Sequence, residues 1–391
     1  MAHRNDSTDQ RQAKPAKPHP DFPLTPHPTG RWCKKVRGKV HFFGPWRDPD
    51  GALVEWLRVK DDLLAGRKPR PKGQAAGVTI KYLVDAYLTR KEQHRDNGEI
   101  KPRTFLDCRV AGVRAADAFG RERVVSDLTA DDFAALRDKL AKTKGPVALG
   151  VEIQRIRSIF KWGYEDGILD NPVRFGTGFK KPSAKTLRID SASRGARDLQ
   201  ADEIRKLIDA ADVTMKAMIL LGVNCGMGNH DVATLPKSGL SLTTGWLDYP
   251  RPKTGVPRRA KLWPETVAAI NAAIAIRPNA KNADDNLVFI TRNGNSWGKD
   301  GPGNNPVYLI FSRLLKDCKL HRPGVGFYSL RRTFETVAGA TADQVAVDHV
   351  MGHAPHVSDM GARYRQRIED NRLEAVAEHV RVWLFGEGGA K

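Results

Sequence analysis

The residues best suited to chemistry lie near the C-terminal end of the sequence. Arg331 stands in a predicted helix, a Gly352-His353 pair follows about twenty residues later, and Tyr364 comes next, flanked by two arginines. A tyrosine hydroxyl has an ordinary pKa of about 10, so near neutral pH it is a weak nucleophile. Surrounding positive charge and hydrogen-bond donors aimed at a phosphate make it competent. This set of groups therefore predicts covalent attack on a phosphodiester.

A lysine also lies in a predicted β-hairpin. The segment PRPKTGVP separates two short predicted strands and places Lys253 in the turn. Each residue also has an ordinary structural interpretation when taken alone: a solvated helix residue for Arg331, a helix cap or surface residue for His353, a packing residue for Tyr364 and a turn residue for Lys253. The order and separation of the four favour a joint chemical role.

The charge of the chain indicates its class of partner. Its 391 residues carry a formal net charge of +20, from 65 Lys and Arg against 45 Asp and Glu. A polyanion is the natural partner of such a chain, and double-stranded DNA is favoured over an anionic membrane surface. No stretch approaches the roughly 20 apolar residues that a membrane span needs, and the first ten residues are polar. We therefore expect a cytoplasmic, DNA-associated protein with no membrane segment.

The cysteines give no sign of a metal site or a disulfide framework. They are far apart and form no CxxC pair: Cys33, Cys108, Cys225 and Cys318. Such scattered cysteines are typical of small buried residues in a reducing compartment. The sequence also lacks carboxylates or histidines at metal-ligand spacing. We therefore expect neither a metal nor a small-molecule cofactor.

Composition and periodicity divide the chain into four parts. Residues 1–30 are rich in Pro, Lys and His and predict a flexible tail, whereas residues 31–73 predict a small sheet, one helix and a basic linker. Residues 77–180 read as helical throughout, and residues 198–391 combine helices with a short hairpin. The expected fold class is mainly α with a small antiparallel sheet, α+β.

Helical periodicity is strongest between residues 77 and 180. Four apolar residues recur at i, i+3, i+4 and i+7 in the first predicted helix: Ile80, Leu83, Val84 and Tyr87. Further along, Thr129 stands where an N-cap residue is expected, and Phe133 begins the apolar stripe that follows it. This part is therefore predicted to be a bundle with its own core.

Residues 77–380 resemble the tyrosine recombinases of the phage-integrase family. The matching segments, in chain order, are Lys253-Thr254-Gly255, Tyr328-Ser329-Leu330-Arg331-Arg332, Met351-Gly352-His353 and Tyr364. The resemblance implies a helical core-binding domain at 77–180 followed by a catalytic domain at 198–391. It also implies integration or excision of a mobile DNA element. The unit at 31–65 resembles, more loosely, the small arm-type DNA-binding domain of some integrases.

The resemblance further implies a role for each site residue. Tyr364 would attack the scissile phosphate, forming a 3′-phosphotyrosyl link and freeing a 5′-hydroxyl. Arg331 would hold the non-bridging oxygens, because a guanidinium offers a phosphate two donors, and Lys253 would protonate the leaving 5′ oxygen. His353 would bond the phosphate or orient the tyrosine, and Tyr328 would donate to a phosphate oxygen. The reaction needs neither metal nor ATP, and the expected assembly is a homotetramer on two DNA sites.

Two departures from the family pattern concern this same site. The family's first arginine should fall within residues 225–231, but Gly228 or Asn229 stands there. Loss of one charge-stabilising donor typically costs about 10²–10³ in rate. The candidate substitutes are Arg332, Arg258 and Arg259. In addition, Tyr328 takes the place of a histidine, and eleven positions separate His353 from Tyr364, slightly more than the family usually has. A catalytically weakened DNA-binding accessory protein is therefore the alternative function.

The predicted contacts to DNA are basic residues in several parts of the chain: Arg31, Lys34, Lys35, Arg37 and Lys39 in the N-terminal unit, Arg155 and Arg157 in the helical part, and Arg332, Arg363 and Arg365 near the site. In the N-terminal unit these cations are interleaved with Trp32 and Phe42, which suits a β-ribbon in a groove. The apolar stripe of the last helix, with Leu373 and Trp383 at its ends, is expected either to dock on a neighbouring subunit or to pack in cis.

Overall fold

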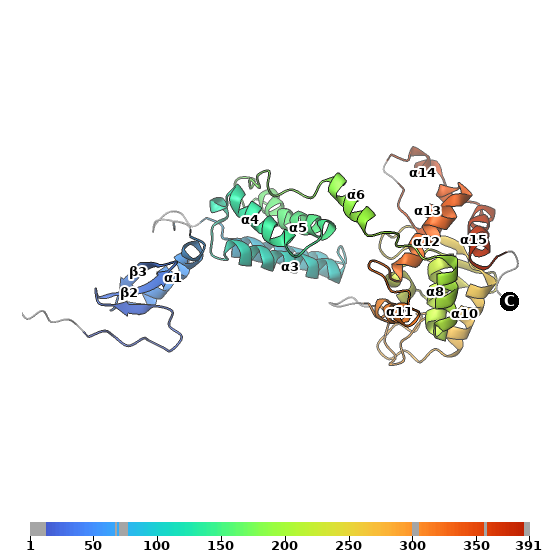
Figure 1. Ribbon diagram of the computed structural model, residues 1–391, viewed down its shortest axis with the longest axis horizontal. Coiled ribbons are helices and arrows are strands. Elements are labelled where there is room, and N and C mark those ends of the chain that lie inside the picture. The colour runs from blue at the N-terminus through green and yellow to red at the C-terminus, as the bar shows by residue number, and fades with distance from the viewer. Residues whose placement is uncertain (1–12, 67–68, 70–76, 299–304, 356–357, 387–391) are drawn as a thin grey trace, which may run out of the picture. The chain divides into compact units, whose positions relative to one another are not determined.

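The computed structural model describes residues 13–66, 69, 77–298, 305–355 and 358–386 of the chain (Figure 1). Two compact units divide it, Met1–Arg188 and Ile189–Lys391. Within the described residues the strands form two antiparallel three-stranded sheets, one in each unit, and helices make up most of the rest. The predicted α+β class is confirmed. The described part of the chain holds no helix that is long and apolar enough to span a membrane.

The N-terminal sheet consists of β1 (Thr25–His27), β2 (Arg31–Val36) and β3 (Lys39–Pro45), and helix α1 (Pro49–Leu64) packs on it. Its core is small and aromatic, with Phe22, Trp32 and Trp56 buried. Asp48 caps α1, accepting a hydrogen bond from the backbone N–H of Gly51 at 2.8 Å.

This sheet corrects two predictions. The tail predicted for residues 1–30 is too long, because β1 pairs with β2 and both Phe22 and Leu24 are buried. Residues 1–12 of that predicted tail, and most of the linker predicted at 66–73, lie outside the described residues. Trp32 is 1% exposed, so it belongs to the core and does not face a DNA groove; a register shift between Trp32 and Cys33 turns both side chains inward.

Four helices form the helical part of the first unit: α2 (Ile80–Asp96), α3 (Pro102–Phe119), α4 (Ala130–Ala141) and α5 (Pro146–Glu165). The predicted stripe of α2 is buried, and Phe133 of α4 lies at the centre of the core, in edge contact with Phe119 and Phe160. Thr129 is the N-cap of α4 in a capping box with Asp132, as predicted.

An ion pair reinforces the start of α4. Arg123, which follows α3 and is 5% exposed, donates to both carboxylate oxygens of Asp132 at 2.8 and 2.7 Å. Burial alone would raise the pKa of Asp132, but hydrogen bonds from Arg123 and Thr129 outweigh burial and lower it to about 2. One further helix, α6 (Ala184–Ser193), lies between the parts predicted at 77–180 and 198–391, and it has no buried residue.

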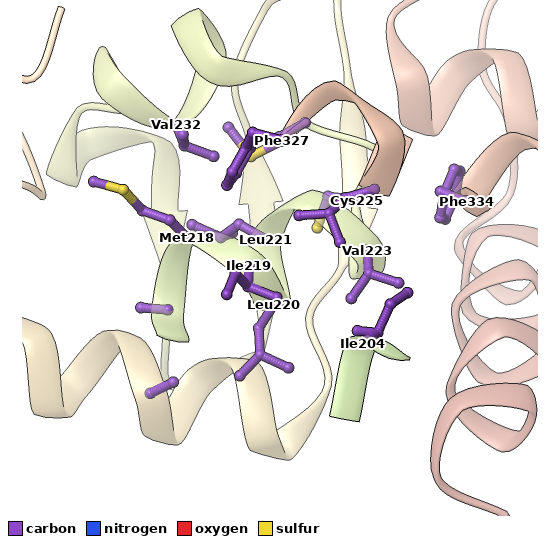
Figure 2. Close-up of a cluster of buried hydrophobic side chains, with 14 of the residues drawn as sticks. Ile204, Met218, Ile219, Leu220, Leu221, Val223, Cys225, Val232, Phe327 and Phe334 are labelled. Carbon is purple, nitrogen blue, oxygen red and sulfur yellow. The ribbon is translucent and has the colours of Figure 1, made fainter. Parts of the chain in front are cut away.

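The core of the second unit is built around α8 (Val213–Asn224), an almost wholly buried helix (Figure 2). Helix α10 (Pro264–Ala275) and α12 (Tyr328–Ala338) pack on it, and α7 (Ala201–Ala210) precedes it. Figure 2 shows Phe327 and Phe334 on either side of Cys225, at the end of α8. Burial raises the pKa of the Cys225 thiol to about 12, so this cysteine stays protonated.

The second sheet has the strands β4 (Leu240–Ser241), β5 (Trp246–Asp248) and β6 (Arg259–Lys261). β5 and β6 are antiparallel partners, as predicted for the hairpin that carries Lys253. The short helix α9 (Asn229–Ala233) connects α8 with this sheet, and α11 (Pro306–Asp317) precedes α12 along the chain. Short 3₁₀ turns lie at Val125–Asp127, Lys237–Gly239 and Gly339–Thr341.

The C-terminal helices are α13 (Gln344–Met351), α14 (Met360–Tyr364) and α15 (Asp370–Phe385). α15 packs within its own unit, with Leu373, Val376, Ala377, Val380 and Leu384 buried. The indole Nε1 of Trp263 donates to the carbonyl oxygen of Ala377 at 2.8 Å. Of the two arrangements expected for this apolar stripe, packing in cis is the one observed in this chain.

Candidate active site

Arg331 lies at the centre of the site. It is on α12 and only 1% exposed, and its guanidinium donates from Nη1 to the carbonyl oxygen of Gly226 at 2.5 Å and from Nη2 to that of Met351 at 2.9 Å. One side chain thus joins the turn after α8 to the end of α13. The interpretation of Arg331 as a solvated helix residue is wrong, because α12 presents it to the interior.

Two more guanidinium groups lie close to Arg331. Burial, followed by the positive charge of Arg251 and a smaller effect of Arg258, lowers the pKa of Arg331 from its ordinary value. All three arginines remain charged, since an arginine guanidinium does not lose its proton in proteins. Like charges so near one another repel, and an anion between them would relieve that repulsion. The cluster therefore has the electrostatics of an anion-binding site.

Arg258 is fixed by two neighbours. It is 2% exposed; its Nε donates to the carbonyl oxygen of Tyr249 at 3.0 Å, and its Nη1 lies 3.3 Å from Oδ2 of Asp231. Asp231 also accepts from the backbone N–H of Gly228 at 2.9 Å, which caps α9. Nη2 of Arg258 is buried and has no hydrogen-bond partner within the described ranges. One donor of this guanidinium is therefore still available to a ligand.

Arg251 lies at the start of the hairpin turn, and sequence reasoning missed it. Its side chain passes close to Gly352, where an added Cβ would stand 2.9 Å from the Cβ of Arg251. Gly352 has φ +63° and caps α13, so both its conformation and this close approach require glycine. Nε of Arg251 is buried without a hydrogen-bond partner among the residues described. The only sequence signal was a second cation two positions before Lys253.

Lys253 itself is exposed in the hairpin turn. The next residue, Thr254, donates from Oγ1 to the carbonyl oxygen of Gly352 at 3.4 Å. The hairpin that carries Lys253 therefore contacts the segment that carries His353. This proximity is what the order of the motifs predicted for the two segments.

His353 follows Gly352 and is oriented by carboxylates. Its Nδ1 lies 3.0 Å from Oδ1 of Asp348 and 3.9 Å from Oε2 of Glu335. An ionised carboxylate only accepts hydrogen bonds, so Nδ1 of His353 is the donor in its contact with Asp348. Glu335, Asp348 and His353 also place one ligand atom each within 4.8 Å of one another, as a metal site would. Sequence spacing did not reveal this group, because its members come from α12, from α13 and from the segment that follows α13.

Tyr328 and Arg332 lie on α12, the helix that carries Arg331, and both side chains are at least partly exposed. Tyr328 is 46% exposed, and the guanidinium of Arg332 lies 5.7 Å from the centre of its ring. The ring also borders the arginine-free turn, because an added Cβ at Gly228 would be 3.6 Å from two of its carbon atoms. Burial, and then the charge of Arg197, lowers the pKa of Arg332.

Arg259, the third candidate substitute for the missing arginine, has other partners. Its Nε donates to Asp370 at 2.8 Å and its Nη1 to Asp248 at 2.5 Å. Hydrogen bonds to these two carboxylates raise the pKa of Arg259. This guanidinium ties β6 to the start of α15 and is occupied.

Tyr364 is the last residue of α14 and is 77% exposed. Its hydroxyl makes no hydrogen bond to any residue that the structure describes. α14 is held at its start by Asp359, which accepts from the backbone N–H of Ala362 at 3.0 Å. A pocket lined by His353, Asp359 and Ala362 lies between α14 and the end of α13. The structure therefore brings Arg331, Tyr328, His353 and the hairpin together and leaves Tyr364 outside their contacts.

The predicted DNA-binding residues fall into two groups. Several are exposed or partly exposed: Arg31, Lys34, Lys35, Arg37, Lys39, Arg363 and Arg365. Arg155 and Arg157 already have partners, because Arg155 donates to Asp107 at 2.5 Å and Arg157 lies 4.3 Å from the ring centre of Phe175. The helical part thus uses these two cations, at least partly, to hold itself together.

Comparison with known proteins finds similarity in structure and not in sequence. No family model matches the chain, and no curated protein sequence matches it significantly. A lambda integrase dimer bound to a COC′ core site is similar with a TM-score of 0.54 and 17% identity, over 91% of this chain and 99% of that one. A lambda integrase tetramer bound to a Holliday junction gives 0.55 and 16%, over 90% and 99%.

The Tn1549 transposon integrase in complex with a circular intermediate DNA is also similar. Its TM-score is 0.56 at 17% identity, over 77% of this chain and 99% of that chain. These likenesses establish that the chain has the tyrosine recombinase fold. The resemblance stated from sequence motifs is confirmed at the level of fold.

Proposed function

We propose that this protein is a site-specific DNA recombinase, an integrase of a mobile element, that cleaves and rejoins duplex DNA through a 3′-phosphotyrosyl intermediate. The observation that carries the proposal is the cluster of Arg331, Arg251 and Arg258 beside His353, in a fold shared with DNA-bound integrases. Three cations, two of which have a buried donor without a partner among the described residues, suit one phosphodiester group. The net charge of +20 suits the polyanion that carries it.

The cleavage step exchanges one phosphoester bond for another. Tyr364 Oη forms a bond to phosphorus while the bond between phosphorus and the 5′ oxygen breaks. The phenolic proton passes to Nε2 of His353 when that imidazole is neutral and its Nδ1 donates to Asp348. Lys253 gives a proton to the leaving 5′ oxygen, and Arg331 binds the non-bridging oxygens as negative charge builds on them. Because a phosphodiester is kept throughout, rejoining needs no ATP.

The remaining parts of the chain supply DNA affinity and assembly. The exposed cations of the N-terminal unit, Lys35 and Lys39 among them, bind DNA phosphates, so binding falls steeply as salt rises. Strand exchange between two duplexes takes four copies of the chain. The protein acts in the cytoplasm, on the DNA of its host and element.

A covalent-capture experiment tests the proposal. The full chain is incubated with a pool of duplexes, each nicked close to a randomised core so that cleavage releases a short fragment and traps the enzyme. We expect a DNA adduct that survives denaturing electrophoresis and is absent with Tyr364→Phe. An adduct that persists in Tyr364→Phe would show that another residue is the nucleophile.

The second candidate function is a DNA-binding accessory protein without cleavage activity. Two observations favour it: the turn at 225–231 has no arginine, and Tyr364 is 77% exposed. The same experiment separates the two functions. Retention of duplexes on the wild-type protein without any covalent adduct would establish the accessory role and refute the recombinase.

A further inference from the structure

Arg251 is positioned to replace the arginine that the turn at 225–231 lacks. We infer that Arg251 contacts the scissile phosphate in place of that arginine, and that Arg258 acts beside Arg331 as a fixed positive charge. The inference rests on the proposed function and names the residue that completes its phosphate-binding group. Sequence reasoning considered Arg258, Arg259 and Arg332 for this role and did not consider Arg251.

The position of Arg251 favours this role. Arg331 holds the carbonyl oxygen of Met351, and the very next residue, Gly352, is the one against which Arg251 packs. Thr254, from the same turn as Arg251, donates to the carbonyl oxygen of Gly352. Two contacts therefore fix the hairpin turn to the short backbone segment, Met351–Gly352, to which Arg331 donates a hydrogen bond. A phosphate bound by Arg331 is within the space that the Arg251 side chain can reach.

The hydrogen-bond donors of Arg251 and Arg258 that have no partner also favour phosphate binding. Nε of Arg251 and Nη2 of Arg258 are both buried and have no partner in the part of the chain that the structure describes. A buried donor without an acceptor costs free energy, and a buried cation without an anion costs more. A phosphate brings acceptor oxygens and negative charge at once, in a geometry that a guanidinium fork matches.

Two of the other candidate arginines are less well placed than Arg251. Arg259 is bound by two carboxylates, those of Asp248 and Asp370. Arg332 lies over the ring of Tyr328, on the exposed side of α12. Neither is held against the backbone segment that Arg331 binds. Arg251 has both the position and the free donor.

The turn itself offers a way to test this replacement. Gly228 has an ordinary φ of −92°, and a Cβ there would meet Tyr328 and Asp231 at 3.6 and 3.7 Å, which is normal van der Waals contact. A side chain can therefore be introduced at Gly228 without moving the backbone. Gly228→Arg should return a guanidinium to the place from which the turn has lost it.

The experiment measures the single-turnover rate of adduct formation on a nicked duplex recovered by covalent capture. We expect Arg251→Ala to lower this rate about 10²–10³-fold, the usual loss for one donor in such a site, with DNA affinity changed by less than about threefold. Arg251→Lys should recover part of the rate, because it keeps the charge and loses the planar fork. Arg251→Ala combined with Gly228→Arg should recover at least tenfold over Arg251→Ala alone.

Arg259→Ala is the matched control, since it removes a neighbouring arginine of the same hairpin. We expect it to keep the adduct rate within about threefold of wild type. A second substrate, with a neutral methylphosphonate at the mapped scissile position, removes the charge that Arg251 is inferred to bind. With that substrate the deficit of Arg251→Ala should shrink to less than about tenfold, whereas a deficit caused by misfolding would remain.

The outcomes distinguish this inference from the proposed function. An adduct that forms at the wild-type rate in Arg251→Ala would refute the inference and leave the recombinase intact. A larger loss in Arg259→Ala than in Arg251→Ala would refute it as well. A wild-type protein that binds duplexes and forms no adduct would refute both.

Discussion

Arg331 and Tyr364 are the two most important residues of the predicted site, and they differ in side-chain exposure and in hydrogen bonding. Arg331 is 1% exposed and spans two backbone segments, whereas Tyr364 is 77% exposed and has no described hydrogen bond. The cations are thus organised by folding itself, while the proposed nucleophile is presented on a five-residue helix at the surface. In the proposed reaction, the two must come together on the DNA.

This comparison extends to what holds each region in place. Hydrogen bonds from Arg331 connect the ends of α8 and α13, and both helices belong to the main core of the second unit. By contrast α14 has no buried residue. Stability and activity are therefore expected to respond differently to changes in the two regions.

The largest expected effect on adduct formation comes from replacing each of these two residues in turn. Arg331→Ala and Tyr364→Phe should both reduce adduct formation by at least about 10³-fold. Only Arg331→Ala should also unfold the protein more easily, by about 3–5 kcal/mol, because it leaves a cavity and two buried carbonyl oxygens without donors. Urea denaturation followed by circular dichroism measures this. Similar stability losses in the two variants would break the comparison.

The sequence predicted the helices of the first unit and the surroundings of Arg331 better than the exposed position of Tyr364, for a physical reason. Helical periodicity and the Thr129 cap identified α2 to α5 because both signals are local, spanning a few residues. The presence of Arg331, His353 and Lys253 in one site also followed from motif order. That Tyr364 would stand apart from them did not follow, because motif order carries no information on exposure.

The Arg251 and Glu335 contacts could not be predicted for a related reason. Arg251 meets Gly352 across about a hundred positions of sequence, and Glu335 meets His353 from a different helix. Such contacts depend on how elements pack, which composition and spacing do not encode. The turn at 225–231 showed that an arginine was missing, but only the packed hairpin indicates which arginine approaches the backbone segment that Arg331 binds.

An intermediate effect is expected from Gly352→Ala, which disturbs the organised region without removing a charge. Gly352 has φ +63°, and a Cβ would stand 2.9 Å from that of Arg251. A residue other than glycine costs about 1–2 kcal/mol in this conformation, and the clash pushes Arg251 away. We expect a modest loss of stability and about tenfold slower adduct formation. Wild-type cleavage in this variant would mean that the hairpin does not need to approach Gly352 so closely.

The smallest effect on the site is expected from Asp132→Asn, because Asp132 belongs to the first unit. Its pKa, lowered to about 2 from an ordinary 3.8, shows that the folded state favours the carboxylate. The stabilisation it gives is therefore complete above about pH 4 and lost as the pH falls through 2. Asp132→Asn should destabilise the first unit at pH 7, since Arg123 loses its bidentate partner.

Denaturation measured at several pH values checks this expectation. The stability difference between wild type and Asp132→Asn should be largest at pH 7 and should disappear between about pH 4 and pH 2. At pH 7, once DNA is bound, the cleavage rate of Asp132→Asn should stay within about threefold of wild type. A cleavage defect as large as that of Arg331→Ala would mean that the organisation of the cations depends on the first unit. Folding of the second unit alone would then not explain the contrast between Arg331 and Tyr364.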